Sequence, residues 1–277
     1  MISSYLLSLR EGIEAALLIG IVLGGLRKVN RTHLSPIVWR GIISAVAISF
    51  IIALALFRLG ASLVGDFEKI YEGITMLFAA GILTWMIFWM HNRSRTLGYE
   101  LESEVRRAVL DSGKKALFVL AFVAVLREGI ELAIFLTAAS MTSSAQTTIL
   151  GVILGLGTAS ILGWLLFKTT IKLDLRKFFL VTGTLLILFA AGLVAHGVHE
   201  FIELGWIPPI VDPLWDMNFI LDEKSTIGLL LKAIFGYNSK PSLSEVIAYV
   251  AYFVAILFGL RWSAQREFSP QKIPNIG

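Results

Sequence analysis

The sequence contains no cysteine, which excludes disulfides, thiolate metal sites and cysteine nucleophiles. Charged residues are scarce as well, at 16% of the chain, whereas a soluble globular domain carries roughly 25%. No basic segment precedes the first apolar run, and Arg10, Glu11 and Glu14 interrupt that run. We therefore expect no cleavable signal peptide.

Apolar residues make up 56% of the chain, and the mean hydropathy is +0.79. They are gathered into seven runs of 17 to 27 residues, and roughly 20 apolar residues are needed to cross a bilayer as a helix. We therefore predict an all-α, polytopic membrane protein that forms a single domain over residues 1–277. The seven predicted spans are Ile2–Leu26, Val38–Val64, Ile70–Met90, Ala116–Met141, Ile149–Phe167, Phe178–Leu204 and Val246–Trp262.

The basic residues predict the orientation of these spans. Loops on one side, with the C-terminal tail, carry seventeen Lys and Arg residues, whereas the alternate loops carry five. Since basic residues remain on the cytoplasmic side, the N-terminus is predicted outside and the C-terminus inside, in a cell membrane. The net charge of +4 is thus a topology signal, and no nucleic-acid partner is expected. In the predicted external loop, about 205–245, we expect a short surface helix at Ile227–Phe235.

Two segments recur along the chain. The sequence Leu-Arg-Glu-Gly-Ile-Glu occurs at 9–14 and again at 126–131, and Leu-Phe-Ala-Ala-Gly occurs at 77–81 and again at 188–192. This pairing predicts two three-helix repeats, at about 1–92 and 114–204, followed by an extra helix at 246–263. Because three is odd, the second repeat is inverted, an arrangement typical of transporters with a site between the halves. The spacings Gly20-x3-Gly24 and Gly151-x3-Gly155 favour close helix packing.

The Arg-Glu-Gly-Ile-Glu motifs place charges inside apolar runs, where they cost several kcal/mol each and usually mark function. Glu11 and Glu14 share a helix face with Arg10, and Glu128 and Glu131 share one with Arg127. Four carboxylates and two guanidinium groups leave a charge of −2 when all are ionised. Because carboxylate oxygens suit hard cations, we predict one metal site from these four glutamates, with the arginines as charge partners. The simpler alternative is a private ion pair within each helix.

A second polar group lies near the external end of the sixth predicted span. Its members, His196, His199, Glu200 and Glu203, fall on one helical stripe and are candidate ligands for a transition metal. Three acidic residues before or within the third span, Asp66, Glu68 and Glu72, are candidate entrance acids. The alternative for both groups is a polar helix end that meets headgroups and water.

The doubled motif resembles the Arg-Glu-x-x-Glu signature of the iron permease family of fungi and bacteria. The resemblance covers nearly the whole chain, including an external loop that runs from Trp215-Asp216 through Phe235-Gly236-Tyr237 to Pro241-Ser242. Ile13 and Ile130 stand where the family usually has leucine, a conservative change. The resemblance implies iron uptake through the four motif glutamates, with iron as the transported substrate and no cofactor. Bacterial members work beside a periplasmic iron-binding protein and a haem peroxidase, and fungal members beside a multicopper oxidase.

Three other functions stay open from the residues alone. Another cation such as Mn2+ or Pb2+ fits the same ligand set. An intramembrane metalloenzyme is suggested by His199-Glu200-x-x-Glu203, which resembles the His-Glu-x-x-His zinc motif, but Glu203 replaces the second histidine. A membrane scaffold without transport fits the duplicated carboxylates poorly. We therefore expect a permease and not an enzyme.

Overall fold

The computed structural model describes residues 1–93, 107, 113–168, 175–223 and 225–267. Every regular element in these residues is helical. The helices are α1 (Ile2–Lys28), the 3-10 turn η1 (Thr32–Leu34), α2 (Ser35–Ser62), α3 (Asp66–Arg93), α5 (Gly113–Met141), α6 (Ala145–Lys168), α7 (Leu175–Glu203), α8 (Thr226–Phe235) and α9 (Leu243–Glu267). The all-helical class is therefore confirmed, and the short helix expected at Ile227–Phe235 is present as α8.

Five helices of the described chain are long and apolar enough to cross a membrane. They cover Thr32–Ser62, Asp66–Trp89, Ala145–Phe167, Lys177–Glu203 and Leu243–Arg261. Helices α1 and α5 have 27 and 29 residues, but each carries the three charged side chains of one motif in its interior. The structure therefore supports a multi-pass membrane protein.

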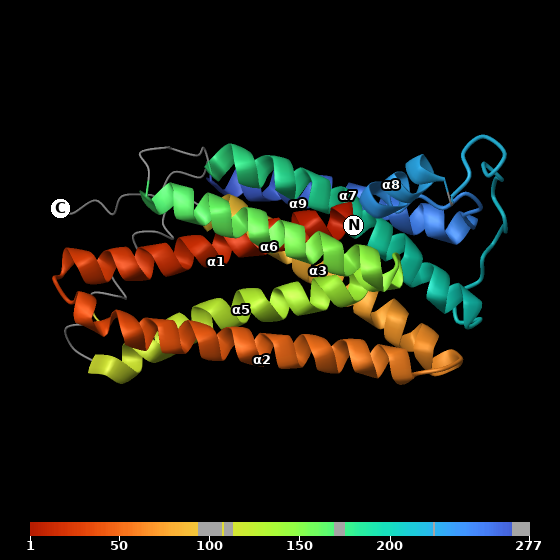
Figure 1. Ribbon diagram of the computed structural model, residues 1–277. Coiled ribbons are helices and arrows are strands. Elements are labelled where there is room, and N and C mark those ends of the chain that lie inside the picture. The colour runs from red at the N-terminus through yellow and green to blue at the C-terminus, as the bar shows by residue number, and fades with distance from the viewer. Residues whose placement is uncertain (94–106, 108–112, 169–174, 224, 268–277) are drawn as a thin grey trace, which may run out of the picture.

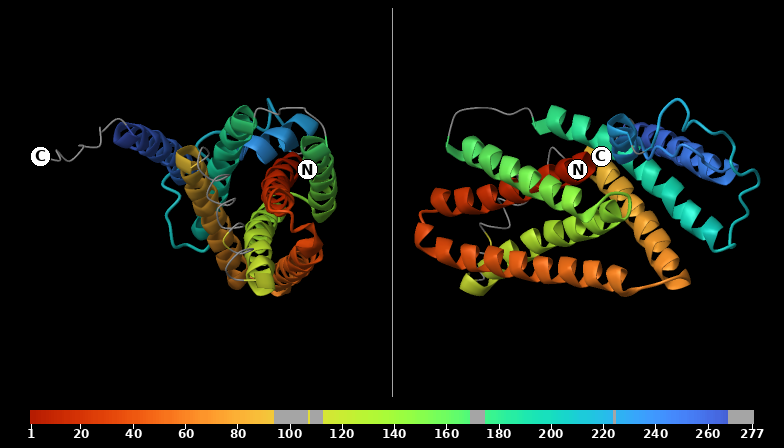
Figure 2. Two further views of the ribbon diagram at one scale, coloured as in Figure 1. Left: turned by 90° about the vertical axis from the view of Figure 1, so that its left-hand side faces the viewer. Right: turned by 45° about the vertical axis from the view of Figure 1, so that its right-hand side comes forward.

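The long helices form a bundle in which three pairs make the most extensive contacts: α1 with α6, α2 with α5, and α3 with α7. The first two pairs lie side by side in Figures 1 and 2. Figure 1 shows the α1–α2 connection and the start of α5 at one end of the bundle. The α2–α3 connection and the segment after α7 lie at the other end. Alternate connections thus lie at opposite ends, as a serpentine membrane bundle requires.

Helix packing depends on small residues at the contacts. An added Cβ on Gly155 in α6 would meet the backbone of α1 at Tyr5 and Leu9, so α6 approaches α1 more closely than any larger residue allows. In the Gly20-x3-Gly24 spacing, Gly20 packs against the ring of Phe167, whereas Gly24 faces open space. The Gly151-x3-Gly155 expectation is thus confirmed, and Gly24 contributes nothing to the packing.

The outer faces of the bundle are apolar. Phe50, Ile51 and Ile43 of α2 are exposed, as are Ile153 and Ile161 of α6. Large exposed apolar surfaces of this extent mark contact with lipid or protein rather than water. Inside, the recurring Leu-Phe-Ala-Ala-Gly segments of α3 and α7 contribute buried alanines to one core cluster.

Candidate metal site

The two Arg-Glu-Gly-Ile-Glu motifs lie near the middle of α1 and α5, which pack against each other in the bundle. Arg10 and Glu11 are each only 1% exposed, and Glu128 and Glu131 are also buried. A helix places residues i, i+3 and i+4 on one face, which explains why each motif turns its charges toward the other. Arg10, Glu11, Glu128 and Glu131 thus lie in the interior of the bundle.

Three of the four motif glutamates converge. Glu11, Glu128 and Glu131 each offer a carboxylate oxygen, and these three atoms lie within 4.8 Å of one another. The Oε2 atoms of the same three residues are buried and have no hydrogen-bond partner in the described chain. Buried carboxylate oxygens without donors are costly, and a multivalent cation bound by several of them would relieve that cost. The geometry suits a cation with oxygen ligands.

In the first motif, the arginine contacts both glutamates. The Arg10 guanidinium lies 3.2 Å from Glu14 and 3.5 Å from Glu11, and it also donates to the sulfur of Met86 at 3.2 Å. Glu14 is paired with Arg10 and does not belong to the converging set. The sequence treats the four glutamates as equivalent ligands; in the structure Glu14 pairs with Arg10 outside the converging set, and metal ligation by Glu14 stays a prediction.

In the second motif, the arginine is more exposed. Arg127 donates through Nε to Glu131 at 2.9 Å, and its side chain is 38% exposed. The guanidinium carbon lies 4.8 Å from the ring centre of Trp89 and 6.0 Å from that of Trp85. These separations are those of cation–π contacts. The two tryptophans of α3 were not among the residues expected to contribute to the site.

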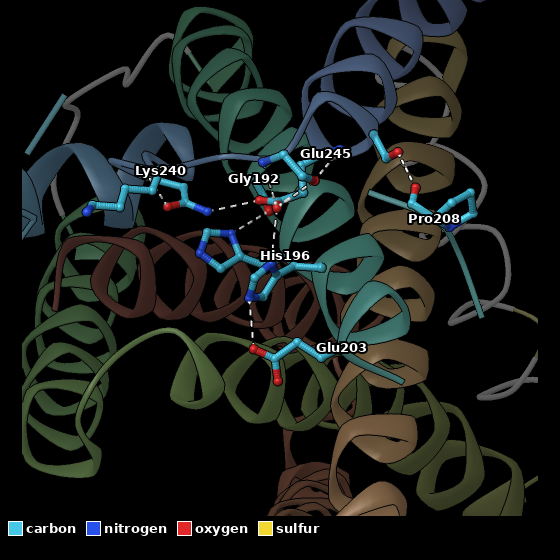
Figure 3. A network of polar contacts seen from close by, with 10 residues as sticks. Gly192, His196, Glu203, Pro208, Lys240 and Glu245 are labelled. Carbon is cyan, nitrogen blue, oxygen red and sulfur yellow. Dashed lines mark hydrogen bonds and ion pairs between the residues drawn. The ribbon is translucent and has the colours of Figure 1, made fainter. Parts of the chain in front are cut away.

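Of the second predicted group, on α7, the residues His196, His199 and Glu203 make polar contacts in the network of Figure 3. His196 Nδ1 lies 3.0 Å from the Gly192 carbonyl oxygen. Because a carbonyl only accepts, that nitrogen donates, which leaves Nε2 as the available ligand atom. His199 lies between two carboxylates, at 3.0 Å from Glu245 and 3.2 Å from Glu203. A metal that used His199 would have to displace one of them, so ligation by this group stays a prediction.

Glu245 is a member of this network that the sequence did not single out. It is buried and accepts hydrogen bonds from Asn238 and from the backbone and hydroxyl of Ser242. The Ser242 hydroxyl in turn accepts from the Glu245 amide. This reciprocal pair is a capping box at the start of α9. The sequence signal for this cap was the Ser-x-x-Glu pattern, which ends one residue before the predicted start of the last apolar run.

The predicted entrance acids lie in α3. Asp66 and Glu68 occupy its first turn, where negative charge stabilises the positive end of the helix dipole. Glu72 is half-buried one turn further on. Their neighbour Lys69 pairs with Glu203 at 2.8 Å, which links α3 to the network on α7. Helix stabilisation accounts for Asp66 and Glu68, and their role as entrance acids stays a prediction.

The segment that follows α7 folds back against it. Helix α8 packs on α7 and ends at Phe235, and its C-cap Gly236, with a left-handed backbone (φ 66°), lies directly against Gly192. Lys232 of α8 pairs with Glu223. Burial acts to raise the pKa of Glu223, but the hydrogen bond and charge of Lys232 outweigh it and lower that pKa below its usual value. The fold-back carries Asn238 and Glu245 to the histidines of α7.

Comparison with known proteins assigns this architecture to a family. Residues 1–270 match the iron permease FTR1 family. Ferrous iron permease EfeU of Escherichia coli O6:K15:H31 is 34% identical over 259 residues, which cover 93% of this chain and 94% of the relative. Ferrous iron permease EfeU of Yersinia pestis is 33% identical over 260 residues, which cover 93% and 92%.

No solved structure matches this chain. The family match extends over both motifs, all the helices described above and the segment that folds back after α7. Its members are named as permeases, which agrees with a bundle of long apolar helices around buried carboxylates and does not indicate an enzyme. The chain belongs to the iron permease FTR1 family.

Proposed function

We propose that this protein takes up iron ions through the site formed by Glu11, Glu128 and Glu131. The observation that carries the proposal is the convergence of their oxygens within 4.8 Å, from two helices, at buried positions. Charged groups at bilayer depth mark ion pathways. The carboxylates select a hard cation, and iron in particular is supported by the family and by the names of the relatives.

We further propose that the transmembrane part consists of seven spans in two inverted repeats, α1–α3 and α5–α7, followed by α9. The motif residues are offset by 117 positions, from Arg10 to Arg127. An added Cβ on Gly151 would meet three atoms at the start of α1: the oxygen of its N-cap Met1, the Cβ of Ser4 and the amide nitrogen of Tyr5. An added Cβ on Gly41 would meet the corresponding atoms of α5: the oxygen of Phe118, the Cβ of Ala121 and the amide nitrogen of Phe122. Each of these residues lies 117 positions after its counterpart in the first set.

The same relation holds beside the glutamates. Gly12 faces the Cβ of Ala159 in α6, and Gly129, 117 positions later, faces the Cβ of Ser49 in α2. The second helix of each repeat thus packs against the first helix of the other repeat: α6 packs on α1, and α2 packs on α5. Such an arrangement supports a twofold relation whose axis passes close to the glutamates, where transporters with inverted repeats hold their substrate.

The proposed orientation predicts which cysteines are reached from each side. In this cysteine-free chain, a Ser144→Cys thiol in the α5–α6 connection should react with an impermeant reagent from outside. A Thr32→Cys thiol in the α1–α2 connection should react only after permeabilisation, as should Ser103→Cys, a position outside the described residues. The basis is the seventeen-to-five distribution of basic residues. The reverse labelling pattern would invert the proposed topology.

The proposed external network should concentrate ions rather than set the maximal rate. His199→Ala or Glu203→Ala is expected to raise the KM for iron about 3- to 10-fold with little change in maximal rate, because an electrostatic entrance acts on encounter. Lys240→Ala, which breaks an exposed pair with Asp216, is the control and should change neither. Unchanged concentration dependence in both network variants would reduce the group to a polar helix end.

The cellular setting is likewise a proposal, based on the resemblance to iron permeases and on the distribution of basic residues. We place the protein in a bacterial inner membrane, with an external iron-binding protein and a haem peroxidase, or an oxidase, as candidate partners that deliver iron. The metalloenzyme alternative loses support because both ring nitrogens of His199 already contact carboxylates. Transport of Mn2+ or Pb2+ is the remaining alternative within the same site.

Metal uptake into proteoliposomes tests the proposal. Purified protein is reconstituted, and Fe2+, Fe3+ and Mn2+ are compared with and without a pH gradient. We expect saturable iron uptake above that of protein-free vesicles, and the preferred oxidation state and driving force follow from the same comparison. Uptake of Mn2+ in preference to both iron ions would move the proposal to the other cation. No uptake of any of the three would overturn it.

A further inference from the structure

One short stretch of α3 contacts the arginines of both motifs. Met86 accepts a hydrogen bond from Arg10, and the rings of Trp85 and Trp89 lie against Arg127. A guanidinium over an indole ring is attracted by the ring quadrupole, most strongly when water is excluded. Helix α3 therefore positions both guanidinium groups that border the glutamate cluster, although it carries neither motif.

The two arginines differ in their exposure. The Arg10 side chain is 1% exposed, whereas that of Arg127 is 38% exposed and Trp85 beside it is 57% exposed. A charged group at bilayer depth faces either the protein interior or a hydrated path, because contact with hydrocarbon is too costly. Arg127 binds Glu131 of the cluster on one side and is exposed on the other. It therefore stands between the carboxylates and a hydrated surface.

The equivalent positions on α7 have the opposite chemistry. The recurring Leu-Phe-Ala-Ala-Gly segment is offset by 111 residues, from Leu77 to Leu188. The same offset relates Trp85 to His196 and Trp89 to Glu200. In the proposed repeat, the external end of the ion's route through the glutamate site thus carries an imidazole and a carboxylate, which attract cations. The other end carries two indoles and a guanidinium, and the guanidinium repels cations.

We propose that Arg127, held by Trp89 and Trp85, is the cytoplasmic gate of the glutamate site. The inference rests on the proposed function, which gives the site its cargo and α3 its orientation. In the closed state the guanidinium neutralises Glu131 and blocks the route past the tryptophans. A cation that reaches Glu131 competes with Arg127 for the same carboxylate. Binding therefore favours the state in which the guanidinium has moved away and the ion can leave.

The gate is tested with a single thiol at the cluster. In the Glu128→Cys protein, the rate of modification by an impermeant thiol reagent is measured separately from the cytoplasmic and the external face. Adding Trp89→Leu or Trp85→Leu should raise the cytoplasmic rate about 2- to 30-fold, the range that loss of a typical cation–π interaction corresponds to. The external rate should stay unchanged. Trp89→Phe keeps an aromatic face and should restore most of the slow rate.

Phe88→Leu is the matched control, because Phe88 is an aromatic of the same helix turn whose ring lies beside Gly259 of α9 instead. It should leave both rates unchanged. Equal rates in the tryptophan variants and their parent, an increase from both faces, or an increase from the external face alone would each overturn the gate. The thiol measurement contains no metal, so its result is independent of whether the protein transports iron.

Discussion

Replacing Glu128 or Glu131 by glutamine is expected to abolish iron uptake while the protein still inserts and folds. Each change keeps the shape of the side chain and removes one negative charge from the three converging carboxylates. Loss of a group that supports a metal ligand typically lowers metal affinity or activity by up to about 100-fold. Loss of a ligand itself, at a site with few ligands, should lower uptake by at least as much. Uptake of iron into proteoliposomes at matched protein content measures the effect.

The double variant Glu128→Gln/Glu131→Gln should be little worse than either single variant, because groups that act as a unit are strongly non-additive. Glu→Asp at the same positions should also fail, since a shorter arm withdraws the ligand oxygen from coordination distance. Asp216→Asn, which removes an exposed external charge, serves as the control and should transport normally. Losses in protein yield that simply add between Glu14→Gln and Glu131→Gln, one change in each motif, would indicate private ion pairs instead.

Glu14→Gln separates the two roles of the first motif. Glu14 pairs with Arg10 and stands outside the converging set, so its loss leaves a buried guanidinium with less compensation. We expect it to abolish uptake as well, with an additional fall in thermal stability that Glu128→Gln does not show. Substantial uptake by the Glu131→Gln protein at normal expression would contradict a site shared by the two motifs, and substantial uptake by the Glu14→Gln protein would show that Glu14 serves only to neutralise Arg10.

A leucine at Gly155 is expected to prevent formation of the bundle. An added Cβ there would meet the backbone oxygen of Tyr5 and the amide of Leu9, and backbone atoms cannot move aside as a flexible side chain can. Overpacking of a well-packed contact costs about 1–3 kcal/mol or more, and a full leucine at a backbone contact lies at the upper end. Yield and melting temperature of the detergent-solubilised protein measure the loss.

Gly157→Leu is the matched control, because an added Cβ on Gly157, in the same helix, meets nothing within 4 Å. Gly41→Leu in α2 should reproduce the loss seen for Gly155, since it would meet the backbone of α5 at Phe118 and Phe122. If Gly41→Leu and Gly155→Leu both fold as well as Gly157→Leu, the close pairing of α1 with α6 and of α2 with α5 is wrong.

The helices were largely predictable because apolar runs of membrane length leave few alternatives in lipid. The predicted run Ile2–Leu26 corresponds to α1, which ends at Lys28, and Ala116–Met141 corresponds to α5, which begins at Gly113. The differences lie at the ends, where polar residues extend a helix beyond its apolar run. Hydropathy registers the apolar part of a helix and not its polar turns.

The chemistry of the motifs was predictable to the level of a shared face, and no further. Spacing places Glu11 and Glu14 on the same side of α1 as Arg10, but it does not say which carboxylate the guanidinium takes. The answer depends on packing against α3, where Met86 holds Arg10. Contributions from a third helix, such as those of Trp85 and Trp89, have no signature in the motif itself. The Leu-Phe-Ala-Ala-Gly repeat indicates a relation between α3 and α7, whose buried alanines share one core cluster, but it does not indicate these two rings.

Metal-binding stoichiometry tests the shared site most directly. Purified protein is titrated with Fe2+ under anaerobic conditions, and bound metal is counted per chain. One ion per chain is expected at the glutamate site, with tight binding lost in Glu11→Gln, in a helix of the first repeat, and equally in Glu128→Gln, in a helix of the second. Two tight ions per chain, of which each variant removes one, would show that each motif binds its own ion and would contradict the account.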